Sequence, residues 1–353
     1  MHEKRRDFLF LVLIVFCVCL FHSAESVASP LKAEKTVCVS IPPQAYLMEK
    51  IAGNKVNIVV LVEKGSSPAT MEVTPSLMGR IGRAGVWFTT GVPFEKVLVS
   101  KVSSVFPSLT IVDCNKNIPL RSIDGDHDSG NDINVVHPAK GGHSHEGMDP
   151  HVWLNPCFAV LQARVMVSWL SQRDPQNSDY YSERFEKTEK SLKQLDNSIR
   201  EILSPFRGMN LVVFHPSFGY FCDAYGLRQI AIEDQGHDPS SRFLAGLMRK
   251  MQLSGVSKIF IQPEFSDRAA RTLAESIGAG VEVLDPLSGD YESAMVEMAR
   301  KIASALGNQK PIGKSQCDAD SANGCSSIDK DKDNDKDVNG MQKGHDHEQH
   351  SGH

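Results

Sequence analysis

The chain has 353 residues, which is too long for one ordinary hydrophobic core and suits two lobes of typical size. Hydrophobic residues make up 41% and charged residues 23%, which excludes a fibrous protein, a disordered regulator and a polytopic membrane protein. The formal net charge of -5 gives no support for nucleic-acid binding.

The first 28 residues are predicted to form a signal peptide. Residues 4–6 are positively charged, residues 8–21 are almost wholly apolar, and small residues at 24–28 offer cleavage sites. The apolar run is shorter than the ~20 residues of a membrane-spanning helix, which disfavours the alternative of an uncleaved anchor. We therefore expect a mature protein that is exported to the periplasm.

Residues 30–172 are predicted to form an N-terminal α/β lobe. Short β-rich runs bounded by Pro, Gly or Asn occur at 36–41, 57–62, 85–90 and 109–114. Helical stretches lie between them at 45–52 and 75–83. Strands that alternate with helices indicate a parallel sheet with helices on both faces.

A second segment with the same pattern, residues 208–306, is predicted to form a C-terminal α/β lobe. Strands are predicted at 211–215, 258–262 and 281–284, and helices at 240–253 and 266–277. The predicted fold class is therefore α/β, with two lobes that each contain a mostly parallel sheet flanked by helices.

A long helix is predicted between the lobes, over residues 175–205. Its central part contains neither Gly nor Pro, and Leu192, Leu195, Ile199 and Ile202 recur at helical spacing on one face. At 1.5 Å per residue such a helix runs ~35 Å or more, which is long enough to join both lobes as a stiff linker. The alternative is one more packing helix inside a single lobe.

Two segments have the composition of disordered chain. Residues 124–148 carry Asp, Gly and Asn with almost no apolar residue, and residues 307–353 are rich in Asp, Lys, Ser and His. The first segment contains four histidines, His127, His137, His143 and His145. Both segments are interpreted as loose metal-capturing regions, with a solvated spacer as the alternative.

Candidate metal ligands follow the predicted strands. His215 and Asp285 each stand where a C-terminal strand ends, and His151 lies in an Asp-Pro-His motif directly after the histidine-rich loop. Ligands bind outside the carboxyl ends of strands in open α/β sheets, so these residues are able to meet in a cleft between the lobes. Each has a structural alternative when taken singly, but together they indicate divalent zinc or manganese.

Several ordered motifs extend this interpretation to a family. They are Ser-Pro-x-Thr-x-Glu-x-Thr-Pro-Ser at 67–76, Gly-Val-Pro-Phe-Glu at 91–95, the motif at 149–156, Phe-His at 214–215, Gly-His-Asp-Pro-Ser at 236–240, Pro-Glu-Phe-Ser at 263–266 and Leu-Asp-Pro-Leu at 284–287. From about residue 36 to 306 the chain resembles the zinc/manganese solute-binding proteins of metal ABC transporters (cluster A-I or cluster 9). The acidic, histidine-rich loop is similar to that of the zinc-uptake members.

The resemblance implies two α/β lobes joined by a rigid helix, with metal held between them by His151, His215 and Asp285. The family's first ligand is a histidine in the Ser-Pro-His-x-Tyr-Glu motif, and this chain has Ala69 there. Tetrahedral zinc takes four donors, so the fourth is left open. Water, Glu72 and the loop imidazoles of His143 and His145 are the alternatives, with His137 and His127 as accessory ligands.

The expected function is capture of zinc, with manganese as the alternative cargo, and delivery to an ABC permease by a monomeric protein that is not an enzyme. The less favoured alternatives are a zinc hydrolase that exploits the position left open by Ala69 and a surface interaction protein. No zinc-protease or nucleophile-elbow motif supports the hydrolase. Glu233 and His237 are interpreted as fold or hinge residues.

Overall fold

A computed structural model describes residues 36–123, 147–233, 241–253, 255–265 and 268–308. The predicted signal peptide, the four loop histidines, His237 and most of the tail lie outside these residues. In the N-terminal lobe a wholly parallel sheet has the strand order β2-β1-β3-β4. Its strands are β1 (Thr36–Val39), β2 (Asn57–Val60), β3 (Val86–Thr89) and β4 (Thr110–Asp113).

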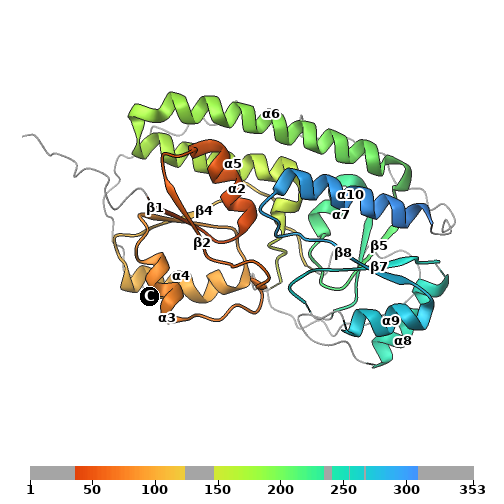
Figure 1. Cartoon of the computed structure of the whole chain (residues 1–353). Coiled ribbons are helices and arrows are strands. Elements are labelled where there is room, and N and C mark those ends of the chain that lie inside the picture. Colours follow the sequence, from red (N-terminus) through yellow and green to blue (C-terminus); the bar gives the residue numbers. More distant parts are fainter. Residues whose placement is uncertain (1–35, 124–146, 234–240, 254, 266–267, 309–353) are drawn as a thin grey trace, which may run out of the picture.

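Helices cover both faces of this sheet (Figure 1). They are α2 (Pro42–Ala52), α3 (Pro75–Ile81), α4 (Pro93–Val105) and α5 (Pro156–Arg173). Each of the four begins with a proline in its first turn, where the missing N–H costs no intrahelical hydrogen bond. Side chains also cap the N-termini of two of these helices. The Thr74 side chain accepts a hydrogen bond from Leu77 N at α3, and the Asn155 side chain accepts one from Cys157 N at α5.

The C-terminal lobe repeats the topology in a second parallel sheet of order β6-β5-β7-β8. Its strands are β5 (Asn210–Val213), β6 (Arg228–Ala231), β7 (Lys258–Ile261) and β8 (Gly280–Val283), and its helices are α7 (Gly219–Tyr225), α8 (Ser241–Leu253), α9 (Arg268–Ile277) and α10 (Tyr291–Gly307). The predicted fold class is confirmed. Strand β6 escaped prediction because it is a short edge strand whose first two residues, Arg228 and Gln229, are polar.

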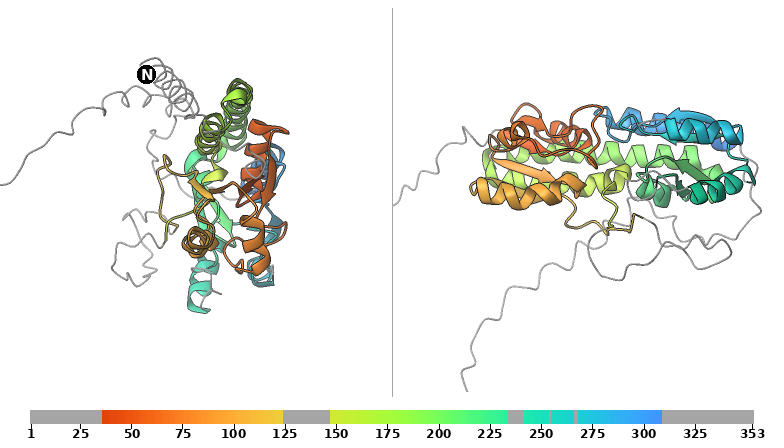
Figure 2. Two further views of the ribbon diagram at one scale, coloured as in Figure 1. Left: turned by 90° about the vertical axis from the view of Figure 1, so that its left-hand side faces the viewer. Right: turned by 90° about the horizontal axis from the view of Figure 1, so that it is seen from below.

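The long helix α6 (Ser178–Leu203, 26 residues) lies along both lobes, as Figures 1 and 2 show. It packs against α5 and α2 of the N-terminal lobe and against α10 of the C-terminal lobe. Leu192, Leu195 and Ile199 are buried, as their spacing predicts, whereas Ile202 is only partly buried. Short 3-10 turns precede α5 at Val152–Leu154 and flank α6 at Pro175–Asn177 and Ser204–Phe206.

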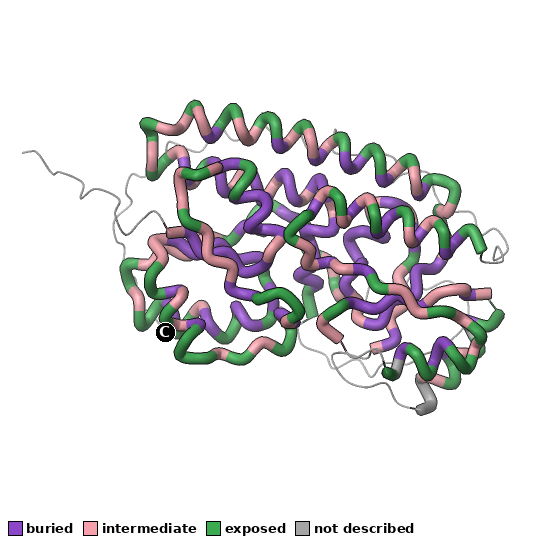
Figure 3. Tube along the Cα trace, in the orientation of Figure 1, coloured by how far each residue is buried: buried purple, intermediate pink, exposed green. Residues whose placement is uncertain are grey.

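One buried hydrophobic cluster runs from the N-terminal sheet through α5, α6 and α10 into the C-terminal lobe (Figure 3). Two hydrogen bonds reinforce the lobe boundary on this side: Trp153 Nε1 donates to Pro286 O (2.8 Å), and the Tyr291 hydroxyl donates to Trp153 O (2.5 Å). A smaller cluster lies between the C-terminal sheet and α8 and α9. Among the described residues, no helix has the length and apolar character needed to cross a bilayer.

Candidate metal centre

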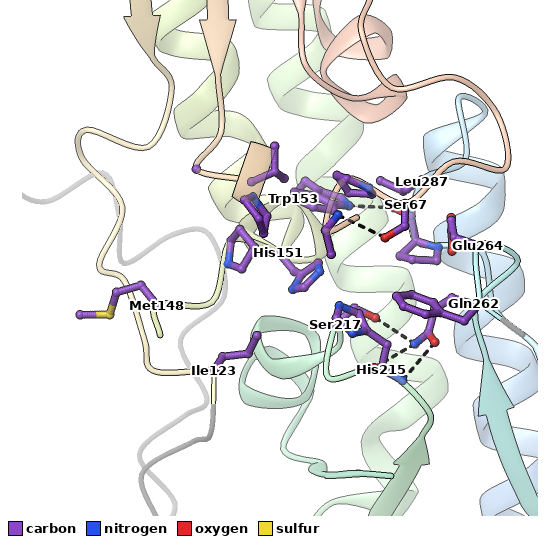
Figure 4. A pocket seen from close by; sticks show the side chains of 18 of the residues that line it. Ser67, Ile123, Met148, His151, Trp153, His215, Ser217, Gln262, Glu264 and Leu287 are labelled. Atoms are coloured by element: carbon purple, nitrogen blue, oxygen red, sulfur yellow. Dashed lines mark hydrogen bonds between the residues drawn. The ribbon is translucent and has the colours of Figure 1, made fainter. Parts of the chain in front are cut away.

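A cleft of about 180 Å³ opens where the carboxyl ends of the two sheets face each other (Figure 4). In each sheet the second strand of the lobe lies on one side of the first strand, and the third strand lies on the other side. The strand order therefore reverses beside the first strand, and the cleft lies at two topological switch points. Its walls come from the turns after five strands: Ser67, Pro68 and Ala69 after β2, Gly91, Val92 and Pro93 after β3, His215 and Ser217 after β5, Gln262, Glu264 and Phe265 after β7, and Pro286 and Leu287 after β8. The remaining lining residues are Lys96, Ile123, Gly147, Met148, Pro150, His151 and Trp153.

His151 lies in the cleft wall directly before the 3-10 turn that leads into α5, and it is 6% exposed. Its Nδ1 is 2.7 Å from Asp149 Oδ1, and its backbone N–H donates to the same oxygen at 2.9 Å. The Asp149 side chain is fully buried. A carboxylate that accepts from Nδ1 leaves the hydrogen on that nitrogen, so Nε2 is the free acceptor of the ring.

His215 follows β5 and is oriented in the same way. Its Nδ1 is 2.5 Å from Oε2 of Glu233, which follows β6. The side-chain amide of Gln262 accepts from His215 N (3.2 Å) and donates to His215 O (3.0 Å), while the Phe265 ring stacks on the imidazole at a centroid distance of 4.6 Å. Burial lowers the pKa of His215, against the opposing effect of Glu233, so the ring stays neutral and able to bind metal over a wider pH range.

The two imidazoles meet across the lobe boundary. The ring centroids of His151 and His215 are 5.4 Å apart and the ring planes are inclined by 76°. Two imidazoles on one tetrahedral zinc, with Zn–N bonds of about 2.0–2.1 Å, have centroids about 5 Å apart. Each ring also has a carboxylate on Nδ1, which is the arrangement that orients histidine ligands in metal sites. This pair is the strongest chemical feature of the cleft.

The predicted carboxylate ligand, Asp285, lies at the end of β8 next to the cleft-lining Pro286. Its Oδ1 accepts from Leu287 N (2.9 Å), which fixes the turn. Glu264 lines the cleft nearby, and burial together with the charge of Asp285 raises the pKa of Glu264 to about 7. Within the described residues, no group of three or more His, Cys, Asp or Glu side chains is arranged to hold a metal ion.

The residues considered for the fourth metal ligand differ in their position relative to the cleft. Ala69 lines the cleft, whereas Glu72 is exposed and is not part of the lining. The loop histidines lie outside the described residues, although the two ends of their loop are joined by a bridge between Ser122 and Met148 at the cleft wall.

The partners of the two imidazoles are not among the residues that the sequence predicts for the site. Glu233, interpreted from the sequence as a fold or hinge residue, lies on His215 Nδ1. Asp149 stands out in the sequence only as part of its motif, although an acidic residue two positions before a candidate ligand is an available signal. Glu264 carries the same signal as His215 and Asp285, because it closely follows a predicted strand.

The turn after β3 is held by a buried carboxylate. Glu95, in the first turn of α4, accepts hydrogen bonds from Thr90 N (2.9 Å) and Gly91 N (2.6 Å). Gly91 has a φ of 81°, a conformation that favours glycine. Burial raises the pKa of Glu95 to about 7, against the effect of these hydrogen bonds. Glu95 therefore maintains the shape of one cleft wall.

The fold and the site together define a class: a two-lobed solute-binding protein whose inter-lobe cleft presents a pair of oriented imidazoles. The chain belongs to the family described as zinc-uptake complex component A, periplasmic, whose model matches residues 37–305. The resemblance inferred from the motifs is confirmed.

Individual relatives agree with this family. The chain is 27% identical over 261 residues to the high-affinity zinc uptake system protein ZnuA of Bacillus subtilis, covering 72% of this chain and 78% of the relative. It is 27% identical over 304 residues to the zinc-binding protein AdcA of Streptococcus pyogenes, covering 83% of this chain and 58% of that longer protein.

Solved structures match as well. A crystal structure of ZnuA has a TM-score of 0.69 and 31% identity, covering 77% of this chain and 99% of that one. A zinc-bound ZnuA deletion mutant also has a TM-score of 0.69 and 31% identity, covering 79% of this chain and 100% of that one.

Proposed function

We propose that this protein binds one zinc ion in the cleft between its lobes, without turning over a substrate, and delivers the ion to the permease of an ABC transporter. The observation that carries the proposal is the pair of imidazoles with centroids 5.4 Å apart, each with Nδ1 on a carboxylate and Nε2 available. Membership of a periplasmic zinc-uptake family supports the same conclusion.

The proposed ligands are His151, His215 and Asp285. Asp285 would reach the ion by a small shift of the turn that Leu287 N now caps. For the fourth position, Glu264 is a better-placed carboxylate than the exposed Glu72, because Glu264 lines the cleft. Water and the loop imidazoles remain the other donors.

Zinc is favoured over manganese because imidazole nitrogen suits zinc, whereas manganese prefers sites rich in oxygen. The zinc names of the relatives agree with this preference. We further propose that residues 1–28 direct export and are removed, and that the mature protein acts as a monomer.

A competitive titration with zinc and manganese against a chromophoric chelator tests the proposal. The protein without residues 1–28 is compared with His215→Ala and with a double deletion of residues 124–146 and 309–353. The deletion keeps the bridge between Ser122 and Met148 and leaves α10 intact.

One tight zinc site that His215→Ala removes and the deletion retains supports a cleft site formed by the described residues. A tight site that the deletion also removes places the fourth ligand in the histidine-rich segments. Weak, multiple binding that His215→Ala leaves unchanged refutes the cleft site.

A further inference from the structure

Arg121 lies where the two lobes touch beside the cleft. It follows β4 in the chain, and its side chain extends over the first residue of α7, Gly219. A Cβ built on Gly219 would lie 1.6 Å from Arg121 Nη1 and 2.5 Å from Asp149 Oδ2. Glycine is therefore needed at this position, because the guanidinium and the carboxylate rest directly on the helix backbone.

The guanidinium stands between two carboxylates that belong to different lobes. Its Nη1 is 3.7 Å from Oδ2 of Asp149, and its Nε is 3.2 Å from Oδ2 of Asp223 in α7. The Asp149 side chain is fully buried, and a buried charge is costly without a counter-charge. In the part of the chain that the structure describes, Arg121 Nη1 and Asp149 Oδ2 have no hydrogen-bond partner, which leaves their mutual attraction as the main interaction of both atoms.

Backbone contacts attach the same elements to one another. Arg121 N donates to the hydroxyl of Tyr220 (3.0 Å), and that hydroxyl donates to Asp149 O (3.3 Å). Asp149 N in turn donates to Arg121 O (2.9 Å). The first turn of α7 is thus joined to the two short segments that contain Arg121 and Asp149.

These contacts connect the two imidazoles by a route outside the cleft. Asp149 accepts from His151 on its Oδ1 and faces Arg121 with its Oδ2. On the other side, Gly219 follows His215 by four residues, through the loop that joins β5 to α7. A displacement of the guanidinium would therefore change the position of His151 relative to His215.

We propose that Arg121 is a positioning residue of the metal site. It lies over Gly219, pairs with Asp223 and holds the Asp149 carboxylate in place. That carboxylate in turn fixes the ring of His151 opposite His215. The proposal rests on the proposed function of the cleft. Arg121 does not contact the ion. It sets the geometry of one imidazole across the lobe boundary.

Three variants test this role. Arg121→Met removes the positive charge, and Arg121→Lys keeps the charge but lacks the planar guanidinium group. Gly219→Ala keeps every charge but displaces the guanidinium. Zinc affinity is measured by competition, and the tautomer of His151 is measured in the metal-free protein by ¹⁵N NMR. Arg164→Met is the matched control, because Arg164 also forms an ion pair, 3.1 Å from Glu189 between α5 and α6 and away from the cleft.

Loss of the carboxylate partner of a ligating histidine usually weakens metal binding by about 10- to 100-fold, and Arg121 acts on such a partner, Asp149. We expect that loss in Arg121→Met, a smaller loss in Arg121→Lys and about tenfold weaker binding in Gly219→Ala. The His151 ring of Arg121→Met is expected to show a mixture of tautomers in place of the Nδ1-protonated form. Arg164→Met should match the unmodified protein in both measurements.

If Arg121→Met folds and binds zinc as tightly as the unmodified protein, the positioning role is wrong. Should Arg121→Met fail to fold, normal affinity and an unchanged His151 tautomer in Gly219→Ala would equally refute the role. A failure of the proposed function is visible separately, since the unmodified protein would then lack a tight site that depends on His215, and the positioning role would fall with it.

Discussion

His151 and His215 face each other across the boundary of the two lobes, with ring centroids 5.4 Å apart. The Nδ1 atom of each ring is hydrogen-bonded to a carboxylate of the same lobe. A site of this kind is sensitive to a third imidazole, to the partner carboxylates and to pH, and each dependence can be measured.

Ala69→His is expected to tighten zinc binding by about tenfold or more, because it adds an imidazole at a cleft-lining position and brings the site closer to four protein ligands. The measurement is the competitive titration with zinc. Thr70→His is the matched control, since it adds the same side chain at an exposed residue that does not line the cleft. An equal gain in both variants would attribute the effect to nonspecific capture.

Glu233→Gln is expected to weaken zinc binding by about 10- to 100-fold, because the amide lacks the charge that orients and supports His215 as a ligand. Its effect on the free energy of unfolding should be small by comparison. Glu282→Gln is a control in the same lobe, where the glutamate pairs with Lys258 at 3.1 Å on the sheet. Unchanged zinc affinity in Glu233→Gln would show that the contact with His215 has no role in binding.

The pH dependence of zinc binding should reflect the buried state of His215. Burial lowers the pKa of this imidazole below its usual 6.5, so protons compete with zinc for it only below that lowered value. By the same linkage, its contribution to stability is present above pH 6.5 and is lost as the pH falls through the folded-state pKa.

Phe265→Ala tests that dependence. Removing the ring stacked on His215 admits water, which raises the pKa of His215 towards 6.5. The acid limb of the zinc-binding profile should therefore move to higher pH in the variant. The prediction fails if titrations from pH 5 to 8 give the same acid limb in both proteins.

Glu95 should make the protein less stable as the pH rises from about 4.5 to 7. The unfolded chain releases this proton near pH 4.5 and the folded protein near pH 7, so the folded state binds more protons between these values and stability falls as the pH increases. A shift of that size corresponds to a change on the order of 3 kcal/mol in the free energy of unfolding.

Glu95→Gln removes the titration, so the free energy of unfolding from urea denaturation should vary less between pH 5 and 8. The variant should also be less stable at pH 5 by about 1–3 kcal/mol, because both oxygens of the protonated carboxyl that Glu95 carries at this pH can accept from Thr90 N and Gly91 N, whereas the amide nitrogen of Gln cannot accept. Glu297→Gln, at an exposed helix position, is the control. Equal pH slopes in Glu95→Gln and the unmodified protein would contradict the assignment.

Many of the helices and strands were predictable because they depend on the pattern of residues that are near one another in the sequence. Alternating runs of strand and helix residues indicated two parallel sheets, and the spacing of Leu192, Leu195 and Ile199 indicated the long amphipathic helix α6. Edge strand β6 was missed because an edge position needs no continuous apolar run, so its polar residues resemble a turn.

By itself the sequence determined the α/β class of the two lobes, the family, the strand-end position of His215 and the motif that contains His151, since these follow from residue patterns and short-range spacing. Tertiary structure alone decided which groups that are far apart in the chain meet: Glu233 on His215, His151 opposite His215 and Arg121 over Gly219. The physical reason is that these contacts join segments distant in the chain, and their distances are set by how the two sheets and α6 pack, which no local pattern encodes.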